Sequence, residues 1–198
     1  MLALVVLSGA GGSGASWIER VDRAPGTISS GGVSVTPGTQ RVELYSRQPV
    51  GSRTYASSTT CTPESGYLEC RVVTSSVAQE ALIPGDRVVV VDRASVAAQG
   101  TNLRGTLEVR VRPLTSSALS AFSGSASATT TITPPTGTAV TGETSSFALS
   151  TKTRQGIGEY TVRTVITTPP SGTTGDWGTA LTGQRLYDGA YTYTFTQT

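Results

Sequence analysis

Residues 103–112 alternate strictly between apolar or small side chains and charged or polar ones. The first set is Leu103, Gly105, Leu107, Val109 and Val111, and the second is Arg104, Thr106, Glu108, Arg110 and Arg112. Because successive side chains of a β-strand point to opposite faces of the sheet, this period of two predicts a strand with one buried and one solvated face. Strands of this kind are typical of antiparallel sheets that cover a core with one side.

Other segments carry related strand signals. Tyr191, Tyr193 and Phe195 alternate with threonines, which predicts a second half-buried strand near the C-terminus. The uninterrupted apolar run Val88–Val91 predicts a strand that is covered on both faces. Further strands are predicted over 71–74, 147–149 and 160–167.

Turn-forming residues separate the remaining strands. Val33 and Val35 predict one short strand and Val42 and Leu44 another, with a turn at Pro37-Gly38 between them. Residues 123–144 consist mainly of Ser, Thr, Gly and Pro, so we expect a long loop there with one edge strand.

These signals predict the fold class. Only residues 75–81 and 114–122 could form short helices, and more than a quarter of the 198 residues are Ser or Thr. We expect an all-β, two-sheet antiparallel sandwich, either jelly-roll or immunoglobulin-like, with long loops and at most short helices. The predicted domain spans residues 17–198 and starts with an N-terminal extension over 17–27.

The N-terminus resembles an export signal. The apolar run Leu2–Leu7 is followed by small residues, and their pattern predicts cleavage of a signal peptide (residues 1–16) between Ala15 and Ser16. No basic residue precedes the apolar run, which suggests a truncated or late start. The alternative is that Ala3–Leu7 forms an ordinary first strand. With a signal peptide, the protein would be secreted, and only that transient segment would meet a membrane.

The composition excludes most catalytic chemistry. The chain has no histidine, so it has no imidazole base and no histidine ligand for a metal. Its carboxylates mostly stand singly, beside an arginine or a turn, as in Asp86-Arg87 and Asp92-Arg93, which is typical of solvated surface charge. The net charge is only +2 and no basic run is present. We therefore expect no enzymatic activity, no cofactor and no nucleic-acid partner.

The two cysteines lie in the stretch CTPESGYLEC, in which Pro63 and Ser65-Gly66 are turn formers. The spacing of Cys61 and Cys70 does not fit a CxxC redox pair, and it predicts a loop or hairpin closed by its own disulfide. Such a bridge would stabilise the fold by about 2 to 3 kcal/mol. The alternative is two free thiols in a reducing compartment.

Four stretches resemble the TasA/camelysin family and its actinobacterial alternate-signal-mediated exported relatives. They are GASWIERVDRAPGTISSGGVSV after the leader, LIPGD (Leu82–Asp86), GTNLRGTLEV (Gly100–Val109) and the terminal DGAYTYTFTQT (Asp188–Thr198). They occur in the order that the family shows. The chain departs from the family in its missing basic leader residues and its single lysine.

The resemblance implies a secreted jelly-roll subunit that polymerises at the cell surface into biofilm or pilus-like fibres, alone or with other matrix or surface proteins. The N-terminal segment of each subunit would complete the sheet of the next. The donor would be residues 17–27, with Trp17, Ile18 and Val21 as anchors. Such pairing is also possible on physical grounds alone, because an open sheet edge has unpaired N–H and C=O groups that an extended peptide from a neighbour can satisfy. A flexible terminus and an intramolecular edge strand are the alternatives for this segment.

Two other functions fit the same fold. A surface module that binds carbohydrate or a host would need exposed aromatic side chains, for which Tyr45, Tyr55, Tyr67 and Trp177 are the candidates. For Trp177 the alternative is a place in the core, which we favour. A viral or phage capsid or tail component would instead keep its apolar N-terminus as an ordered strand.

Overall fold

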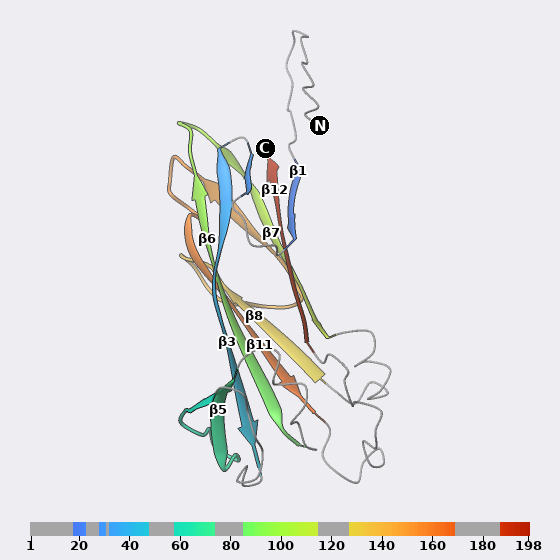
Figure 1. Cartoon of the computed structure of the whole chain (residues 1–198). Helices are drawn as coiled ribbons and strands as arrows, with labels where there is room; N and C mark the ends of the chain where they lie inside the picture. Colours follow the sequence, from blue (N-terminus) through green and yellow to red (C-terminus); the bar gives the residue numbers. More distant parts are fainter. Residues whose placement is uncertain are drawn as a thin grey trace, which may run out of the picture.

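The computed structural model describes residues 18–22, 28–30, 32–47, 58–73, 85–114, 127–168 and 187–198. Within these ranges the regular structure consists of β-strands, with no helix and no cis peptide bond. The predicted all-β sandwich of two antiparallel sheets is confirmed (Figure 1). The leader (1–16), Trp17, Tyr55, Trp177 and the segments 74–84 and 115–126 lie outside the described residues.

The described strands form two sheets. The first, sheet A, has the order β1 (Ile18–Asp22), β12 (Tyr187–Gln197), β7 (Arg104–Leu114) and β10 (Thr144–Ser150). The second, sheet B, has the order β4 (Ser58–Thr60), β5 (Glu69–Val73), β3 (Val33–Ser46), β6 (Arg87–Ala98), β11 (Gly158–Thr167), β8 (Ser127–Thr133) and β9 (Val140–Thr141), and β2 (Ile28–Ser30) pairs with β3. All of these strand pairs are antiparallel.

The strand order identifies a jelly roll. Sheet A, β1-β12-β7-β10, packs against sheet B, in which β6-β11-β8-β9 are consecutive neighbours. From β6 onward the chain crosses to the other sheet at every connection except β8 to β9, which are neighbours in sheet B. This is the eight-stranded, double Greek-key arrangement. Strands β2 to β5 are inserted between β1 and β6, and they extend sheet B beyond β6.

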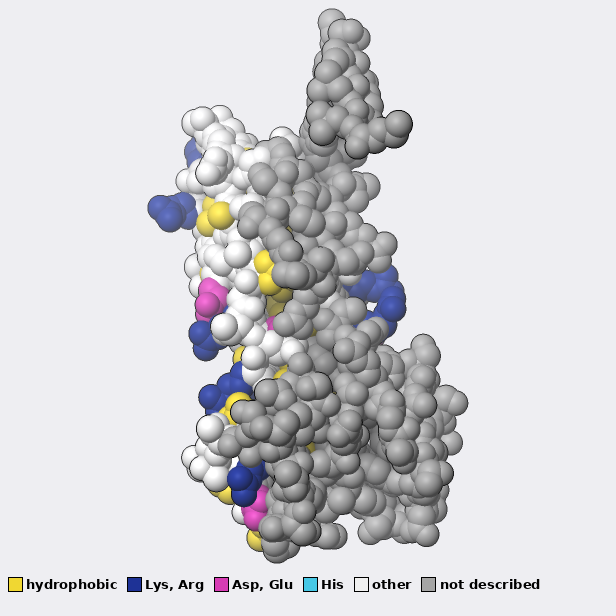
Figure 2. Space-filling view, in the orientation of Figure 1, with side chains coloured by type: hydrophobic (Ala, Val, Ile, Leu, Met, Phe, Trp, Pro, Cys, Tyr) yellow, Lys and Arg dark blue, Asp and Glu magenta, His cyan; other side chains and the backbone are white. Residues whose placement is uncertain are grey.

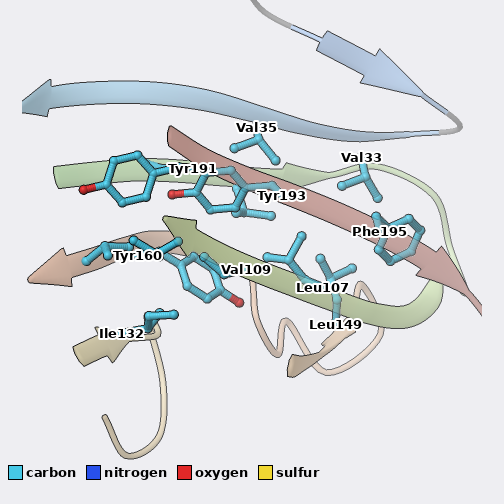
Figure 3. Close-up of a cluster of buried hydrophobic side chains, with 14 of the residues drawn as sticks. Val33, Val35, Leu107, Val109, Ile132, Leu149, Tyr160, Tyr191, Tyr193 and Phe195 are labelled. Atoms are coloured by element: carbon cyan, nitrogen blue, oxygen red, sulfur yellow. The ribbon is translucent and has the colours of Figure 1, made fainter. Parts of the chain in front are cut away.

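The predicted alternation is confirmed on the central strands. In β7 the side chains of Leu107, Val109 and Val111 are buried, and their neighbours at 106, 108, 110 and 112 are exposed. In β12 the rings of Tyr191, Tyr193 and Phe195 are buried in the same core (Figure 3). Sheet B contributes Val33, Val35, Val96, Ile132, Tyr160 and Val162 from the opposite side. The core therefore joins the two sheets through residues that the period of two predicts.

The turn predicted at Pro37-Gly38 is wrong, because Val33–Ser46 is one continuous strand. The register against β6 shifts between Pro37 and Gln40, which face Ala94 and Asp92, so β3 carries one extra residue there. This β-bulge changes which residues face inward, from Val33 and Val35 before it to Val42 and Leu44 after it. In the sequence, the apolar residues move from odd positions (33 and 35) to even positions (42 and 44), and this shift led to the prediction of two strands.

Gly105 is required by a close approach between β7 and β12. A β-carbon at this position would lie 2.3 Å from the carbonyl oxygen of Thr196 and 2.5 Å from the ring of Phe195. The first of these atoms belongs to the backbone, so it cannot move aside without disturbing the ladder.

We predict that Gly105→Ala destabilises the protein by about 2 kcal/mol, because the added methyl group overpacks the contact between β7 and β12. Chemical denaturation measures this change. Thr106→Ala, at the neighbouring exposed position, is the control and should change stability by less than about 0.5 kcal/mol. Equal stability of the two variants would contradict the packing described here.

Candidate functional site

The N-terminal strand β1 forms one end of sheet A. It pairs antiparallel with β12 over five residues, from Ile18 opposite Thr196 to Asp22 opposite Thr192. On its other side β12 pairs with β7 over the range Tyr187–Gln197. In the described part of the chain β12 is therefore the one strand that holds β1 in place (Figure 1).

The sequence left three possibilities for this segment, and the structure describes residues 18–22 as an intramolecular edge strand. Ile18 and Val21 both belong to it, at positions opposite Thr196 and Tyr193. Trp17, the third expected anchor, lies outside the described residues. The chain thus closes the edge of β12 with its own N-terminal strand.

The β12 strand is well anchored without β1. The rings of Tyr191, Tyr193 and Phe195 are between 3 and 7 % exposed and pack in the main core. The ladder of β12 with β7 is longer than its ladder with β1. Loss of β1 would therefore leave the backbone groups on one side of β12 without partners, while its side chains stayed packed. A strand with these properties is suited to accept a replacement strand.

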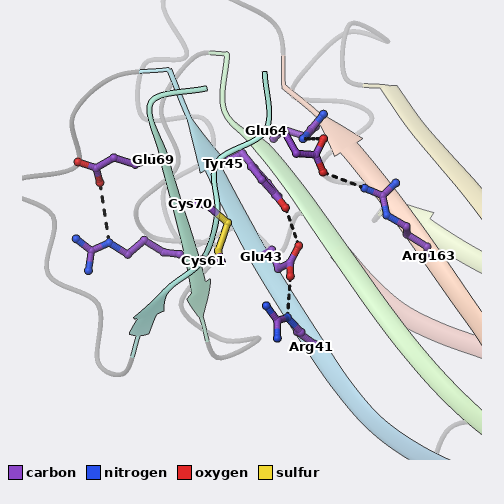
Figure 4. Close-up of a disulfide and its surroundings, with 10 residues drawn as sticks. Arg41, Glu43, Tyr45, Cys61, Glu64, Glu69, Cys70 and Arg163 are labelled. Atoms are coloured by element: carbon purple, nitrogen blue, oxygen red, sulfur yellow. Dashed lines mark hydrogen bonds and ion pairs between the residues drawn. A yellow bond between two sulfur atoms is a disulfide. The ribbon is translucent and has the colours of Figure 1, made fainter. Parts of the chain in front are cut away.

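A second cluster lies at the disulfide. Cys61 and Cys70 form the predicted bridge, with Cα atoms 5.0 Å apart, and it closes the hairpin of β4 and β5. The N–H of Cys61 donates to the carbonyl of Cys70 (3.1 Å). Gly66, with φ +88°, forms the turn in which the N–H of Tyr67 donates to the carbonyl of Glu64. Of the predicted turn formers, Ser65-Gly66 therefore lie in the turn, and Pro63 precedes it. Figure 4 shows the disulfide and its surroundings.

The hairpin is attached to the outer face of sheet B by aromatic and charged contacts. The rings of Tyr45 and Tyr67 meet edge to face at 5.7 Å, and the guanidinium of Arg87 lies 4.6 and 4.5 Å from their centres. Glu64 forms ion pairs with Arg87 and, at 3.6 Å, with Arg163. These contacts cover Val89, which is fully buried.

Of the four candidate binding aromatics, the structure describes two and brings them together. Tyr45 is only 4 % exposed and Tyr67 is half-buried, so neither ring stands free on the surface. Tyr55 and Trp177 are outside the described residues. Figure 2 shows that basic side chains on the described part of the visible face are scattered and do not form a patch.

Two carboxylates that the sequence assigned to the solvated surface are buried. Asp86 is fully buried, and its carbonyl oxygen accepts hydrogen bonds from the backbone N–H and the hydroxyl of Thr168. Asp92 is 5 % exposed, and Gln40 Nε2 donates to its Oδ2 at 3.0 Å. The signal was present in the sequence, since Asp92 continues the inward set Val88, Val90, Ala94 and Val96 of β6.

Asp92 lines a hollow between the two sheets at the β3 bulge. The other lining residues are Val35, Pro37, Gly38, Arg93, Ala94, Tyr191 and Tyr193. The hollow therefore borders β12, the strand that holds β1.

The described residues contain no cluster of three or more side chains that could hold a metal ion, and none of their segments is a helix that could cross a bilayer. Comparison with protein-family models, with curated proteins and with solved structures gives no match for this chain.

Two tyrosines have perturbed acidity. Burial, reinforced by the hydrogen bond from its hydroxyl to Glu43 (2.8 Å), raises the pKa of Tyr45 to about 12. Burial raises the pKa of Tyr160 to about 12 as well, and its hydroxyl donates to the carbonyl of Gly156.

We predict that these two groups make the fold sensitive to alkali. A phenol whose pKa is raised on folding stabilises the protein fully below its unfolded pKa of 10, and this contribution is lost as the pH rises toward 12. Urea unfolding between pH 9 and 12 should show the loss, and a Tyr45→Phe, Tyr160→Phe variant should show less of it. Phenolate absorbance near pH 10 from all seven tyrosines of the folded protein would contradict this prediction.

Proposed function

We propose that this chain is a secreted structural subunit of a cell-surface or biofilm-matrix fibre, and that subunits assemble by exchanging β1. The observation that supports this most is the place of β1 at the end of sheet A, where one strand, β12, holds it through five register pairs. In the fibre, β1 of one subunit would pair with β12 of the next. The principal partner is thus a second copy of the same chain.

Exchange makes a fibre without any new kind of contact. The same five register pairs form within a subunit or between two subunits. The equilibrium between the closed monomer and the fibre therefore depends mainly on the protein concentration and on the entropy of the chain. A subunit that donates β1 in one direction and accepts it in the other makes a head-to-tail contact. Contacts of this type extend into an open filament unless a ring closes.

The proposed location is outside the cell. The expected signal peptide would free the segment that contains β1 when it is removed. The disulfide between Cys61 and Cys70 is compatible with an oxidising compartment, in which such bridges persist. The resemblance to the TasA/camelysin family adds the expectation of a matrix fibre.

The jelly-roll order also favours one second candidate, a viral or phage capsid or tail component, because this topology is common in capsid proteins. Electron microscopy of the purified protein separates the two. Filaments of a chain that starts at Ser16 or Trp17 support the fibre subunit, whereas closed shells or tail particles of a chain that retains Met1 support the viral component.

We predict that deletion of residues 17–27 abolishes filaments and leaves a folded, soluble monomer, because the deletion removes β1 and keeps the core strands. Circular dichroism and light scattering check the monomer, and electron microscopy checks the filaments. Filaments of normal abundance after this deletion would exclude exchange of β1.

A covalent lock between β1 and β12 of the same subunit should also prevent assembly. Arg20 and Thr194 are opposite each other in the register, so Arg20→Cys with Thr194→Cys places two thiols at facing positions. We expect the oxidised variant to remain monomeric and to form filaments after mild reduction. The control is Arg20→Cys alone, which should assemble under both conditions. If the oxidised double variant assembles as well as the control, filaments form without release of β1 from β12, and the proposal is contradicted.

A further inference from the structure

Strand β10 forms the other end of sheet A. In the described part of the chain, β7 is the one strand that it pairs with, in a register that runs from Thr144 opposite Arg110 to Ser150 opposite Arg104 without a bulge. Edge strands are usually protected from other chains by charged side chains, proline or bulges. The sequence of β10, TSSFALS, has no charged residue and no proline. This edge therefore lacks the usual protection against pairing with a second strand.

The hydrogen bonds to β7 show which backbone groups of β10 face outward. The N–H of Val111 donates to the carbonyl of Glu143 (2.7 Å), so these two residues form a hydrogen-bonded pair at the start of the ladder. Hydrogen-bonded pairs occur at every second residue of antiparallel strands. Thr144 and Ser146 lie between such pairs, and their N–H and C=O groups are therefore directed away from β7.

The C-terminal half of this edge is covered by the turn that follows β10. The N–H of Ser150 donates to the carbonyl of Gln155 (3.0 Å). Gly156 lies against the strand, since a β-carbon there would be 2.4 Å from the carbonyl oxygen of Ala148. Residues 144–146 are different, because among the described residues no backbone group bonds to them on the outward side. We call residues 144–146 the open edge.

Ser145, in the middle of the open edge, has a buried hydroxyl without a partner. The residue is 6 % exposed, and its Oγ is enclosed and forms no hydrogen bond to the described residues. Such a hydroxyl is destabilising, because it has lost its hydrogen bonds to water without replacement. Hydroxyl side chains that face each other on adjacent antiparallel strands can bond to each other. A second strand with a serine opposite Ser145 would supply the missing partner.

We propose that the open edge binds the same edge of a second copy of this chain, antiparallel and centred on Ser145. Thr144 of each copy would exchange its outward N–H and C=O bonds with Ser146 of the other, and the two Ser145 hydroxyls would face each other. Both copies use the same residues, so the contact is isologous. It differs from the exchange of β1, which takes place at the opposite edge of sheet A.

The charges of β7 favour this centre over neighbouring ones. On the exposed face of sheet A, Thr144 lies beside Arg110 and Ser146 lies beside Glu108. Pairing Thr144 with Ser146 places Arg110 of one copy in the same row as Glu108 of the other. A pairing centred on Thr144 would place two arginines in one row, and a pairing centred on Ser146 would place two glutamates there. The charges are separated by two strands, so they influence the register more than the affinity.

A contact of this length is weak between two single subunits, and the chain stays monomeric in dilute solution. In a fibre the open edge recurs in every subunit. Two filaments side by side would be joined by many such contacts, and their combined effect is much stronger than one. The fibre half of this proposal rests on the proposed function, whereas the pairing of two open edges does not.

A buried thiol in the full chain tests the pairing. Ser145→Cys places it at the centre of the contact, where facing Cα atoms are about 4.5 Å apart, within the range of a disulfide. We expect a mild oxidant at high protein concentration to link two chains through position 145, as mass spectrometry of the digested product shows. Adding Ser146→Pro removes an outward N–H that β7 does not use and should slow the linkage about tenfold. Adding Ser146→Ala keeps this N–H, and this matched control should link at the rate of Ser145→Cys alone.

Two results would overturn the pairing. One is a Ser145→Cys chain that stays unlinked at position 145, and this result does not depend on the folding of the proline variant. The other is linkage at equal rates with Ser146→Pro and with Ser146→Ala.

Electron microscopy of Ser146→Pro and Ser146→Ala, without the added thiol, tests the fibre half. We expect single filaments from the proline variant and bundles from the alanine variant, and equal bundling would contradict this half. Filaments from a chain that does not link through position 145 would remove this proposal and keep the fibre function. Linkage in a protein that forms no filaments would do the reverse.

Discussion

The ladder between β7 and β12 is the interaction on which the rest of this protein depends. It places Leu107 and Val109 beside Tyr193 and Phe195 in one inward-facing layer of sheet A, and this layer closes the core over sheet B (Figure 3). Gly105 allows the two backbones to approach closely enough for the ring of Phe195 to fit. Because β12 is secured by β7 and by its own buried rings, its other edge can hold one further strand through backbone pairing. That strand is β1 in the subunit, and in the proposed fibre it is β1 of a neighbour.

Much of the fold could be predicted from the sequence because the half-buried strands obey a period of two. Residues 103–112 and 191–195 have one apolar and one polar set each, and burial in the structure follows these sets. Over residues 123–144 the sequence predicted a long loop with one edge strand, whereas the structure has β8 between β11 and β9 there. The strand signal of β8 is weak because the segment is nearly all Ser and Thr. Its inward-facing Thr130 is buried through a hydrogen bond to Thr164 (3.1 Å), and not through apolar character. The β3 bulge was missed because a change of phase beside Pro and Gly looks the same in sequence whether the chain turns or bulges.

The candidate site was only partly accessible from the sequence. The segment with Ile18 and Val21 could be chosen as a strand donor, but its partner is 170 or more positions away in the chain, and no local pattern identifies it. Tyr45 and Tyr67 were singled out as separate candidates, and the disulfide hairpin instead joins them around Arg87. Asp92 was assigned to the surface because its neighbour is an arginine. The strand period places it inward, where it lines the hollow beside β12.

The central claim is that β1 of one subunit pairs with β12 of another, and a mixed cross-linking measurement tests it most directly. Two variants, Arg20→Cys and Thr194→Cys, carry single additional thiols at positions that face each other in the register. They are mixed, allowed to assemble, oxidised and analysed by mass spectrometry. The account predicts disulfide-linked chains that join Cys at position 20 of one variant to Cys at position 194 of the other. Filaments without this cross-link would contradict it.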